Sequence, residues 1–227
     1  MEYLNESYKN RLRELAGLKN TLNESMSGKH LVVVDIQPEY QSGFGNMHIE
    51  LAKFIEANWN DFSNVTFLYN GEDTLGMISE QEYQWWWIEE AELSEEIISQ
   101  SGWYDKGYAF FRFCMDSGMD DESTTNLVRY MISKDVHDSR DLDEEFWDGF
   151  IQAYGNEDIR ELIEFSGDAI NIPELMEELK NYGNIVICGG GVNECLKEVE
   201  IALDALGKSY SKLNQFVYQE QTSTQGS

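Results

Sequence analysis

Two polar residues follow apolar runs that have the composition of buried strands. Asp35 comes directly after the run 30–34, HLVVV, and Cys195 follows the run 184–188, NIVIC, after a turn that begins with three glycines. A short, continuous, β-branched run is typical of a buried strand in a parallel sheet. Open α/β sheets place their sites beyond the carboxyl ends of such strands. We therefore expect Asp35 and Cys195 to lie at the same edge of one sheet.

The position of Cys195 suits nucleophilic chemistry. It begins a stretch whose apolar residues recur at helical spacing. Backbone N–H groups and the dipole at a helix N-terminus favour a thiolate. The glycine-rich turn lets backbone amides approach a substrate closely, so the amides of Gly190, Gly191 and Val192 are the candidates for stabilising a developing oxyanion.

Two other interpretations of this turn remain open. Cys195 could be a small core residue beside a tight glycine turn, and the nearby Glu194 and Glu198 disfavour a thiolate. The pair Gly189-x-Gly191 also begins a dinucleotide-binding pattern. Glu194, however, holds the place of the third glycine of that pattern, and a carboxylate there would repel a phosphate.

Two segments resemble the signatures of the isochorismatase-like cysteine hydrolases. The run 33–40, VVDIQPEY, resembles the first signature, in which an apolar strand precedes Asp-x-Gln and an aromatic residue. The run 186–196, VICGGGVNECL, resembles the second, in which a strand and a glycine precede the nucleophilic cysteine. The family's catalytic lysine follows a middle strand; Lys106 is the best match to it, and Lys134 is the fallback.

The resemblance implies a three-layer αβα fold with a mostly parallel sheet and a small amide-like or related substrate. It implies Cys195 as the nucleophile, Asp35 as the proton carrier and Lys106 as their charge partner. It also implies a homo-oligomer and a non-proline cis peptide bond between Gly190 and Gly191.

The chain departs from the family at three places, one of which is the stretch of 89 positions from Lys106 to Cys195, longer than is usual in the family. Val192 stands where a threonine-like residue is usual, and the stretch after Tyr69 lacks the metal-binding Asp-x-His of the family's nicotinamidases. We therefore expect neither a metal nor a cofactor.

The elements expected to position these residues follow the order strand, helix, strand, which predicts a right-handed βαβ unit. The patterns predict strands at 30–36, 64–69 and 184–188 and a possible last strand at 216–218, with helices at 49–59, from Pro173 and after Cys195. Residues 79–100 also have a helical pattern and contain three adjacent tryptophans, Trp85 to Trp87. Neighbours on a helix lie about 100° apart, so at least one of these rings should meet a pocket, another element or a partner.

We expect a single domain over residues 1–227. It would include a helix at 1–28, an acidic helical insertion at 116–171 and a disordered tail at 222–227. The apolar stripe of the first helix would pack on the domain or form a dimer seam.

Composition narrows the class of protein. The hydrophobic fraction of 41% excludes a disordered chain, and the formal charge of −27 disfavours nucleic acids and anionic membrane surfaces as partners. No apolar run approaches a membrane span of about 20 residues, and no apolar signal core follows the N-terminus, so we expect a cytoplasmic protein. Three scattered cysteines and three scattered histidines indicate neither a disulfide framework nor a zinc site.

Two functions remain. The first is a cysteine-dependent hydrolase that acts on a small molecule. The second is a catalytically inactive isochorismatase-like fold that serves as a binding or protein-interaction module, with the acidic insertion and the tryptophans contacting a partner. Convergence of Asp35, a lysine and Cys195 would favour the enzyme. We also expect Cys188, which closes an apolar strand, to be buried and unreactive.

Overall fold

The fold is seen in a computed structural model that describes residues 26–71, 78–106, 118–136, 141–155, 158–165 and 175–218. The expected helix at 1–28 lies almost wholly outside the described residues, as do the predicted helix start at Pro173 and the tail at 222–227.

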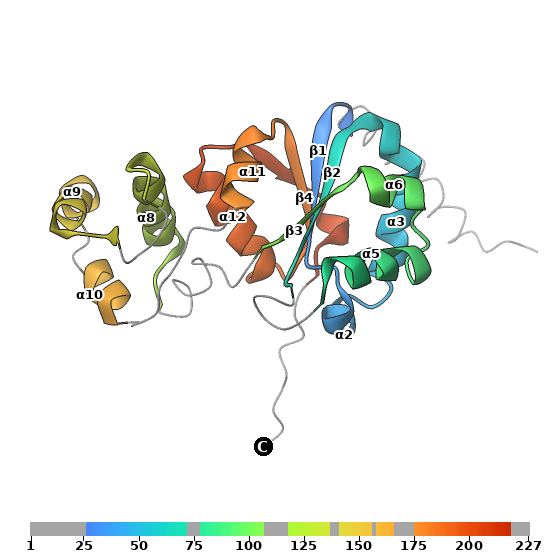
Figure 1. The fold of residues 1–227 in the computed structure, drawn as a ribbon, viewed down its shortest axis with the longest axis horizontal. Helices are drawn as coiled ribbons and strands as arrows, with labels where there is room; N and C mark the ends of the chain where they lie inside the picture. Colours follow the sequence, from blue (N-terminus) through green and yellow to red (C-terminus); the bar gives the residue numbers. More distant parts are fainter. Residues whose placement is uncertain are drawn as a thin grey trace, which may run out of the picture.

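Five parallel strands form the sheet in the order β3-β2-β1-β4-β5 (Figure 1). They are β1 (Lys29–Val34), β2 (Phe62–Tyr69), β3 (Gly102–Asp105), β4 (Ile185–Gly189) and β5 (Tyr210–Lys212). In the register of the central strands, Val34 lies opposite Leu68 of β2 and Gly189 of β4, so all three strands end at one level. The expected α/β class with a parallel sheet is confirmed.

The described helices are α2 (Gln41–Phe44), α3 (Met47–Asn58), α5 (Glu80–Glu89), α6 (Glu95–Gln100), α8 (Asp121–Ser133), α9 (Glu144–Tyr154), α10 (Asp158–Phe165), α11 (Leu175–Asn181) and α12 (Cys195–Ala205), with 3-10 turns η1 (Pro38–Tyr40), η2 (Trp59–Asp61) and η4 (Asn214–Phe216). The segment 79–100 is thus two helices rather than one. The possible last strand at 216–218 is wrong, because Phe216 ends a 3-10 turn and Tyr218 makes only an isolated bridge to Gly191.

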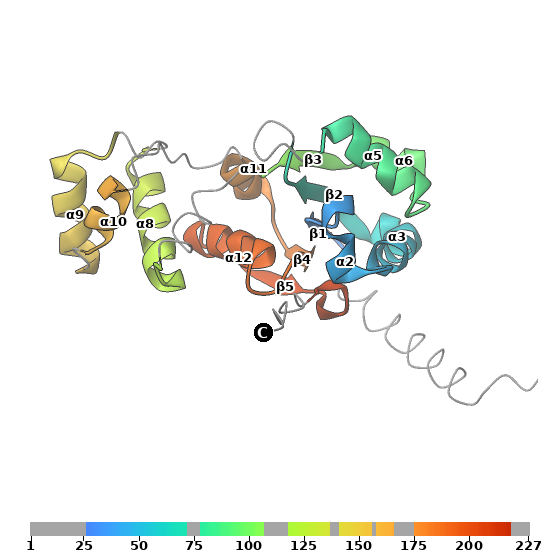
Figure 2. The same cartoon turned by 90° about the horizontal axis from the view of Figure 1, so that it is seen from below.

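Helices cover both faces of the sheet because successive side chains of β1 point in opposite directions. Leu31 and Val33 join one core with side chains of α3, α5 and α6. Val32 and Val34 join the other core, which α11 and α12 cover. Figure 2 shows the sheet between these two layers of helices. None of the described helices is long and apolar enough to cross a membrane.

The helices α8, α9 and α10 lie beyond α12 on the side away from the sheet (Figure 1). Polar contacts join α8 to α12: Lys197 Nζ lies 2.6 Å from Asp121 Oδ2, and an Arg129 guanidinium N–H donates to the Asp204 carbonyl at 2.9 Å. Helical structure is therefore observed where the acidic insertion was expected, and it packs on the main body through charged as well as apolar groups.

The connections reverse direction beside β1. From β1 the chain moves through β2 to β3 on one side, and it later returns to β4 on the other side of β1. Right-handed crossovers in opposite directions place their helices on opposite faces, as observed. The reversal makes the carboxyl ends of β1 and β4 a topological switch point, where open α/β sheets bind their ligands.

Candidate functional site

Asp35 lies at the switch point, immediately after β1. Its side chain is fully buried, and its backbone N–H donates to the Leu68 carbonyl at 2.9 Å. Its φ is 45°, in the left-handed region that few residues other than glycine adopt. Such strain costs on the order of 1–3 kcal/mol, and it is found most often at sites where a side chain must point in one direction.

Lys106 lies two strands away and reaches the same place. It follows β3, which pairs with β2, and its backbone N–H donates to the Tyr69 carbonyl at 2.8 Å. Its buried ammonium lies 2.5 Å from Asp35 Oδ2 and 2.6 Å from Glu198 Oε2. One cation is therefore held between two buried carboxylates.

The second of these carboxylates comes from the helix that Cys195 begins. Glu198 lies three residues after Cys195 on α12, and this spacing puts both side chains on one helix face. From the sequence, Glu198 is expected only to oppose the thiolate, and its pairing with Lys106 is not predicted. The three-residue spacing from Cys195 is the signal that could have placed Glu198 at the site.

Two glycines let the end of β4 approach its neighbours. Gly189 has a φ of 79°, and a Cβ there would collide with the Val34 carbonyl oxygen of β1. Gly190 has a φ of 63°, and a Cβ there would lie 2.8 Å from the Leu196 nitrogen of α12. The glycines thus allow the first turn of α12, with Cys195, to pack close to the end of β1.

The expected cis peptide bond is wrong. The described residues contain no cis peptide bond, so the bond between Gly190 and Gly191 is trans. The turn closes instead through the positive φ of Gly190 and through the Val192 N–H, which donates to the Tyr218 carbonyl at 3.1 Å. Because that hydrogen bond occupies the Val192 amide, the oxyanion role expected for it does not fit the structure.

The electrostatics of the site favour a neutral thiol at rest. Burial raises the pKa of Cys195 well above its usual range, and the Asp35 carboxylate raises it further, while Lys106 opposes the shift. For Lys106, burial alone would lower the pKa, but Asp35 and Glu198 outweigh burial and raise it. At neutral pH the site therefore holds a thiol and an ammonium ion, and the thiol needs a base before it can attack.

Asp35 has the position and the free atom for that role. Neither of its buried carboxylate oxygens has a hydrogen-bond partner among the described residues, and Oδ1, unlike Oδ2, also has no ion pair there. A buried acceptor that lacks a partner is uncommon and destabilising, and a catalytic role is one reason for which such a group is retained. The described geometry therefore offers one carboxylate oxygen to accept a proton, while the other binds the Lys106 ammonium.

Three polar side chains form a network beside Asp35. The backbone N–H of Asn70 donates to Gln37 Oε1 at 2.9 Å, and Asn70 Nδ2 donates to the Tyr40 hydroxyl oxygen at 3.0 Å. Burial raises the pKa of Tyr40 to about 12, and Asp35 and Cys195 are further causes of the rise. Tyr40 is half-buried and is therefore a neutral hydroxyl at the rim of the site.

The other sequence candidates lie elsewhere. Lys134 is exposed at the end of α8, where its ammonium lies 5.3 Å from the centroid of the Tyr130 ring. Cys188 is a free, fully buried cysteine, and burial raises its pKa. Within the described ranges, no cluster of three or more histidine, cysteine, aspartate or glutamate side chains is arranged to hold a metal ion.

Comparison with protein-family models, curated proteins and solved structures finds no match to this chain. The resemblance to the isochorismatase-like hydrolases therefore rests on the two motif segments and on the lysine after β3.

Proposed function

We propose that this protein is an isochorismatase-like cysteine hydrolase that cleaves a small amide-like or related substrate. One observation carries the proposal: Asp35, Lys106 and the Cys195 helix, which are far apart in the sequence, meet at the switch point of the sheet. We extend the proposal to a homo-oligomer, which the resemblance implies, located in the cytoplasm.

The proposed reaction begins with proton transfer from Cys195 to Asp35. The resulting thiolate attacks the carbonyl carbon of the amide, and the C–N bond breaks as the nitrogen takes the proton from Asp35. The products of this half-reaction are a free amine and an acyl group in thioester linkage to Cys195. Water, deprotonated by Asp35, then attacks the thioester, and the carboxylic acid leaves as the thiol regains its proton.

In this scheme Lys106 stabilises negative charge and takes no part in making or breaking bonds. Its ammonium stabilises the Asp35 carboxylate at rest and the thiolate that forms on proton transfer. The N–H groups of Gly190 and Gly191 remain the proposed donors to the oxyanion, since the Val192 N–H is already used.

Mass spectrometry of the protein mixed with a panel of small amides and esters tests the proposal. We expect amine or alcohol release together with an acyl adduct on the α12 peptide that contains Cys195. The Cys195→Ser variant should lose turnover by about 10³-fold or more, as removal of a catalytic nucleophile does. Cys188→Ala is the matched control, because it removes a thiol from the strand beside the site. Turnover that survives in Cys195→Ser, or adduct formation at Cys188, would contradict the mechanism.

The raised pKa of Cys195 and the occupied Val192 amide favour one alternative, an inactive fold of the same type that binds a ligand or protein. In that case no member of the panel would be turned over, and Cys195→Ser would bind its ligand as tightly as the unchanged protein does.

A further inference from the structure

A shallow groove of about 600 Å³ lies on the outer surface of α5, apart from the residues of the proposed reaction. Its lining residues are Gln81, Glu82, Trp85, Trp86, Glu89 and Glu90. Four of them follow the spacing of a single helix face, with Glu82 and Glu89 at the two ends and two tryptophans between them. We call this surface the α5 groove.

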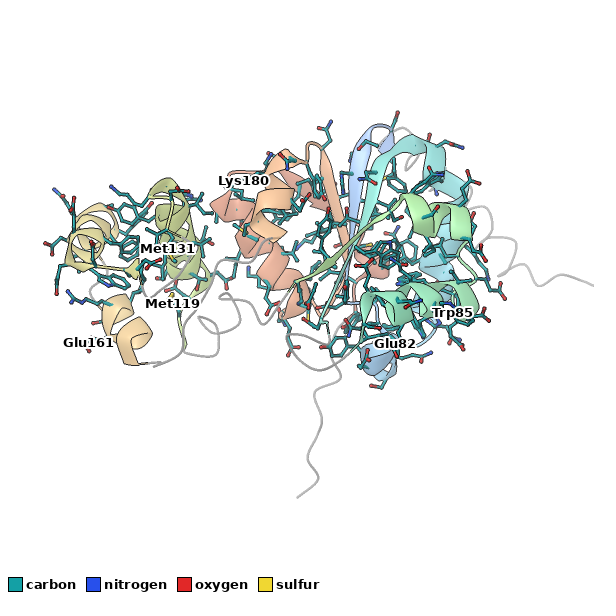
Figure 3. The ribbon with its side chains drawn as sticks, in the orientation of Figure 1. Glu82, Trp85, Met119, Met131, Glu161 and Lys180 are labelled. Atoms are coloured by element: carbon teal, nitrogen blue, oxygen red, sulfur yellow. The ribbon has the colours of Figure 1, made fainter. Side chains whose placement is uncertain are left out.

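The three adjacent tryptophans have three different environments. Trp87 is fully buried, whereas Trp86 is half-buried and stacks on His48 with ring centroids 4.9 Å apart. Trp85 is 61% exposed and is the only large hydrophobic side chain exposed to this degree among the described residues. Figure 3 shows Trp85 and Glu82 on the outer side of the molecule. The groove thus has one ring fixed by packing and one ring open to a ligand.

The carboxylates of the groove are placed to hold a cation. Glu82 is fixed by the capping box of α5, where its carboxylate accepts from the Ser79 hydroxyl at 2.7 Å. Glu89 and Glu90 lie at the C-terminal end of the same helix, where the helix dipole disfavours negative charge. That last turn has no basic residue, and burial lowers the pKa of the neighbouring His48, which therefore stays neutral beside Glu90 at neutral pH. A bound cation would relieve this repulsion.

We propose that the α5 groove binds an arginine-bearing segment of a partner protein. A guanidinium is planar, stacks on an indole face and pairs with a carboxylate through two parallel hydrogen bonds. The groove offers both partners within one helix face, through Trp85 and its flanking glutamates. A lysine ammonium would also be attracted by these carboxylates, but it cannot stack flat on an indole while it forms two parallel hydrogen bonds with a carboxylate. Lysine is therefore the weaker ligand.

The charge of the chain selects against the other occupants. Nucleic acids and anionic membranes would be repelled from the α5 groove by its glutamates and by the net charge of −27. An exposed indole is also typical of the anchor positions of protein interfaces, where tryptophan and arginine are enriched.

Fluorescence anisotropy with a labelled tetra-arginine peptide tests the proposal at 0.15 M salt, with tetra-lysine as the second probe. We expect tetra-arginine to bind the full chain more tightly than tetra-lysine does. Trp85→Ala should weaken tetra-arginine binding by about tenfold, which corresponds to ~1.4 kcal/mol of lost stacking. Because Trp85 is exposed, this variant should fold as the unchanged protein does, and circular dichroism checks it.

A matched pair of double variants separates the groove from the acidity of the whole surface. Glu89→Gln with Glu90→Gln removes two charges inside the groove, and Glu95→Gln with Glu96→Gln removes two exposed charges on α6 outside it. Only the first pair should weaken binding by severalfold. The proposal is overturned if the two pairs weaken binding equally, if Trp85→Ala binds like the unchanged protein, or if tetra-arginine does not bind.

Discussion

Replacing Lys106 by methionine tests how the charges at the switch point are balanced. The ammonium lies within 2.6 Å of carboxylate oxygens on both Asp35 and Glu198, and its own side chain is only 3% exposed. Removing one member of a buried ion pair leaves an unpaired charge and costs about 3–5 kcal/mol. Because two carboxylates lose their partner here, we expect a loss of about 4 kcal/mol in the free energy of unfolding. That is a large share of the roughly 5–15 kcal/mol typical of a domain.

A second substitution should partly reverse this loss. In the Lys106→Met background, Glu198→Gln removes one of the two unpaired charges and should restore about 1–2 kcal/mol, whereas Glu198→Gln alone should be destabilising. Urea unfolding followed by tryptophan fluorescence measures all four proteins of the cycle. Arg160→Met is the control, since Arg160 pairs with the 76% exposed Glu144 at 2.7 Å and should lose less than about 1 kcal/mol.

Two results would refute this reasoning. The first is a Lys106→Met variant that loses no more stability than Arg160→Met does. The second is a further loss when Glu198→Gln is added to Lys106→Met, which would show that Glu198 contributes through packing rather than through charge.

Three further predictions use other residues. Native alkylation followed by peptide mass spectrometry should modify Cys195 before the buried Cys188, and faster as the pH rises from 7 to 9, because burial raises the pKa of Cys195; equal labelling of both would contradict this. Gly189→Ala should lower the free energy of unfolding in urea by about 3 kcal/mol, because the added Cβ collides with β1. Gly207→Ala, where φ is also positive at 65° but the Cβ meets no atom, should lower it by only about 1–2 kcal/mol, and equal losses would contradict the steric explanation. Burial lowers the pKa of His30 from 6.5 to about 4, so the imidazole is protonated at a higher pH in the unfolded chain than in the folded protein. The stability that this difference contributes is present above pH 6.5 and is lost as the pH falls towards 4. The loss is on the order of 3 kcal/mol, and an unchanged acid dependence of urea unfolding in His30→Gln would exclude this cause.

The central strands could be predicted from the sequence, and the edge strands could not. The buried strands β1 and β4 are continuous β-branched runs, which few other elements resemble. The edge strands β3 and β5 are only four and three residues long and carry no buried side chain. Their position depends on backbone pairing with a neighbour, which leaves no apolar pattern. Residues 216–218 are apolar and therefore resemble a strand in the sequence. Phe216 and Tyr218 are indeed buried, but Phe216 ends a 3-10 turn rather than a strand.

The candidate site could also be predicted from the sequence only in part. Asp35 and Cys195 follow strong strand signals, so their shared edge of the sheet could be expected from the sequence. The place of Lys106 came from the family resemblance alone, because β3 has no sequence signal of its own. The pairing of Lys106 with Glu198 joins residues that are 92 positions apart in the sequence. The spacing of Glu198 from Cys195 places its carboxylate on the Cys195 face of α12, but no local pattern names Lys106 as its partner.

The central position of β1 has a consequence for synthesis of the chain. β1, β2, β3 and Lys106 all leave the ribosome early, whereas β4 and Cys195 follow roughly 90 residues after Lys106, about 5–20 s later at common translation rates. Until β4 arrives, the apolar β1 is an edge strand with one row of unpaired backbone groups, the kind of edge that promotes aggregation. A nascent chain that stalls before residue 185 would therefore present this edge to other chains. Its Asp35 and Lys106 would also lack Glu198, the second carboxylate of the site, which α12 supplies.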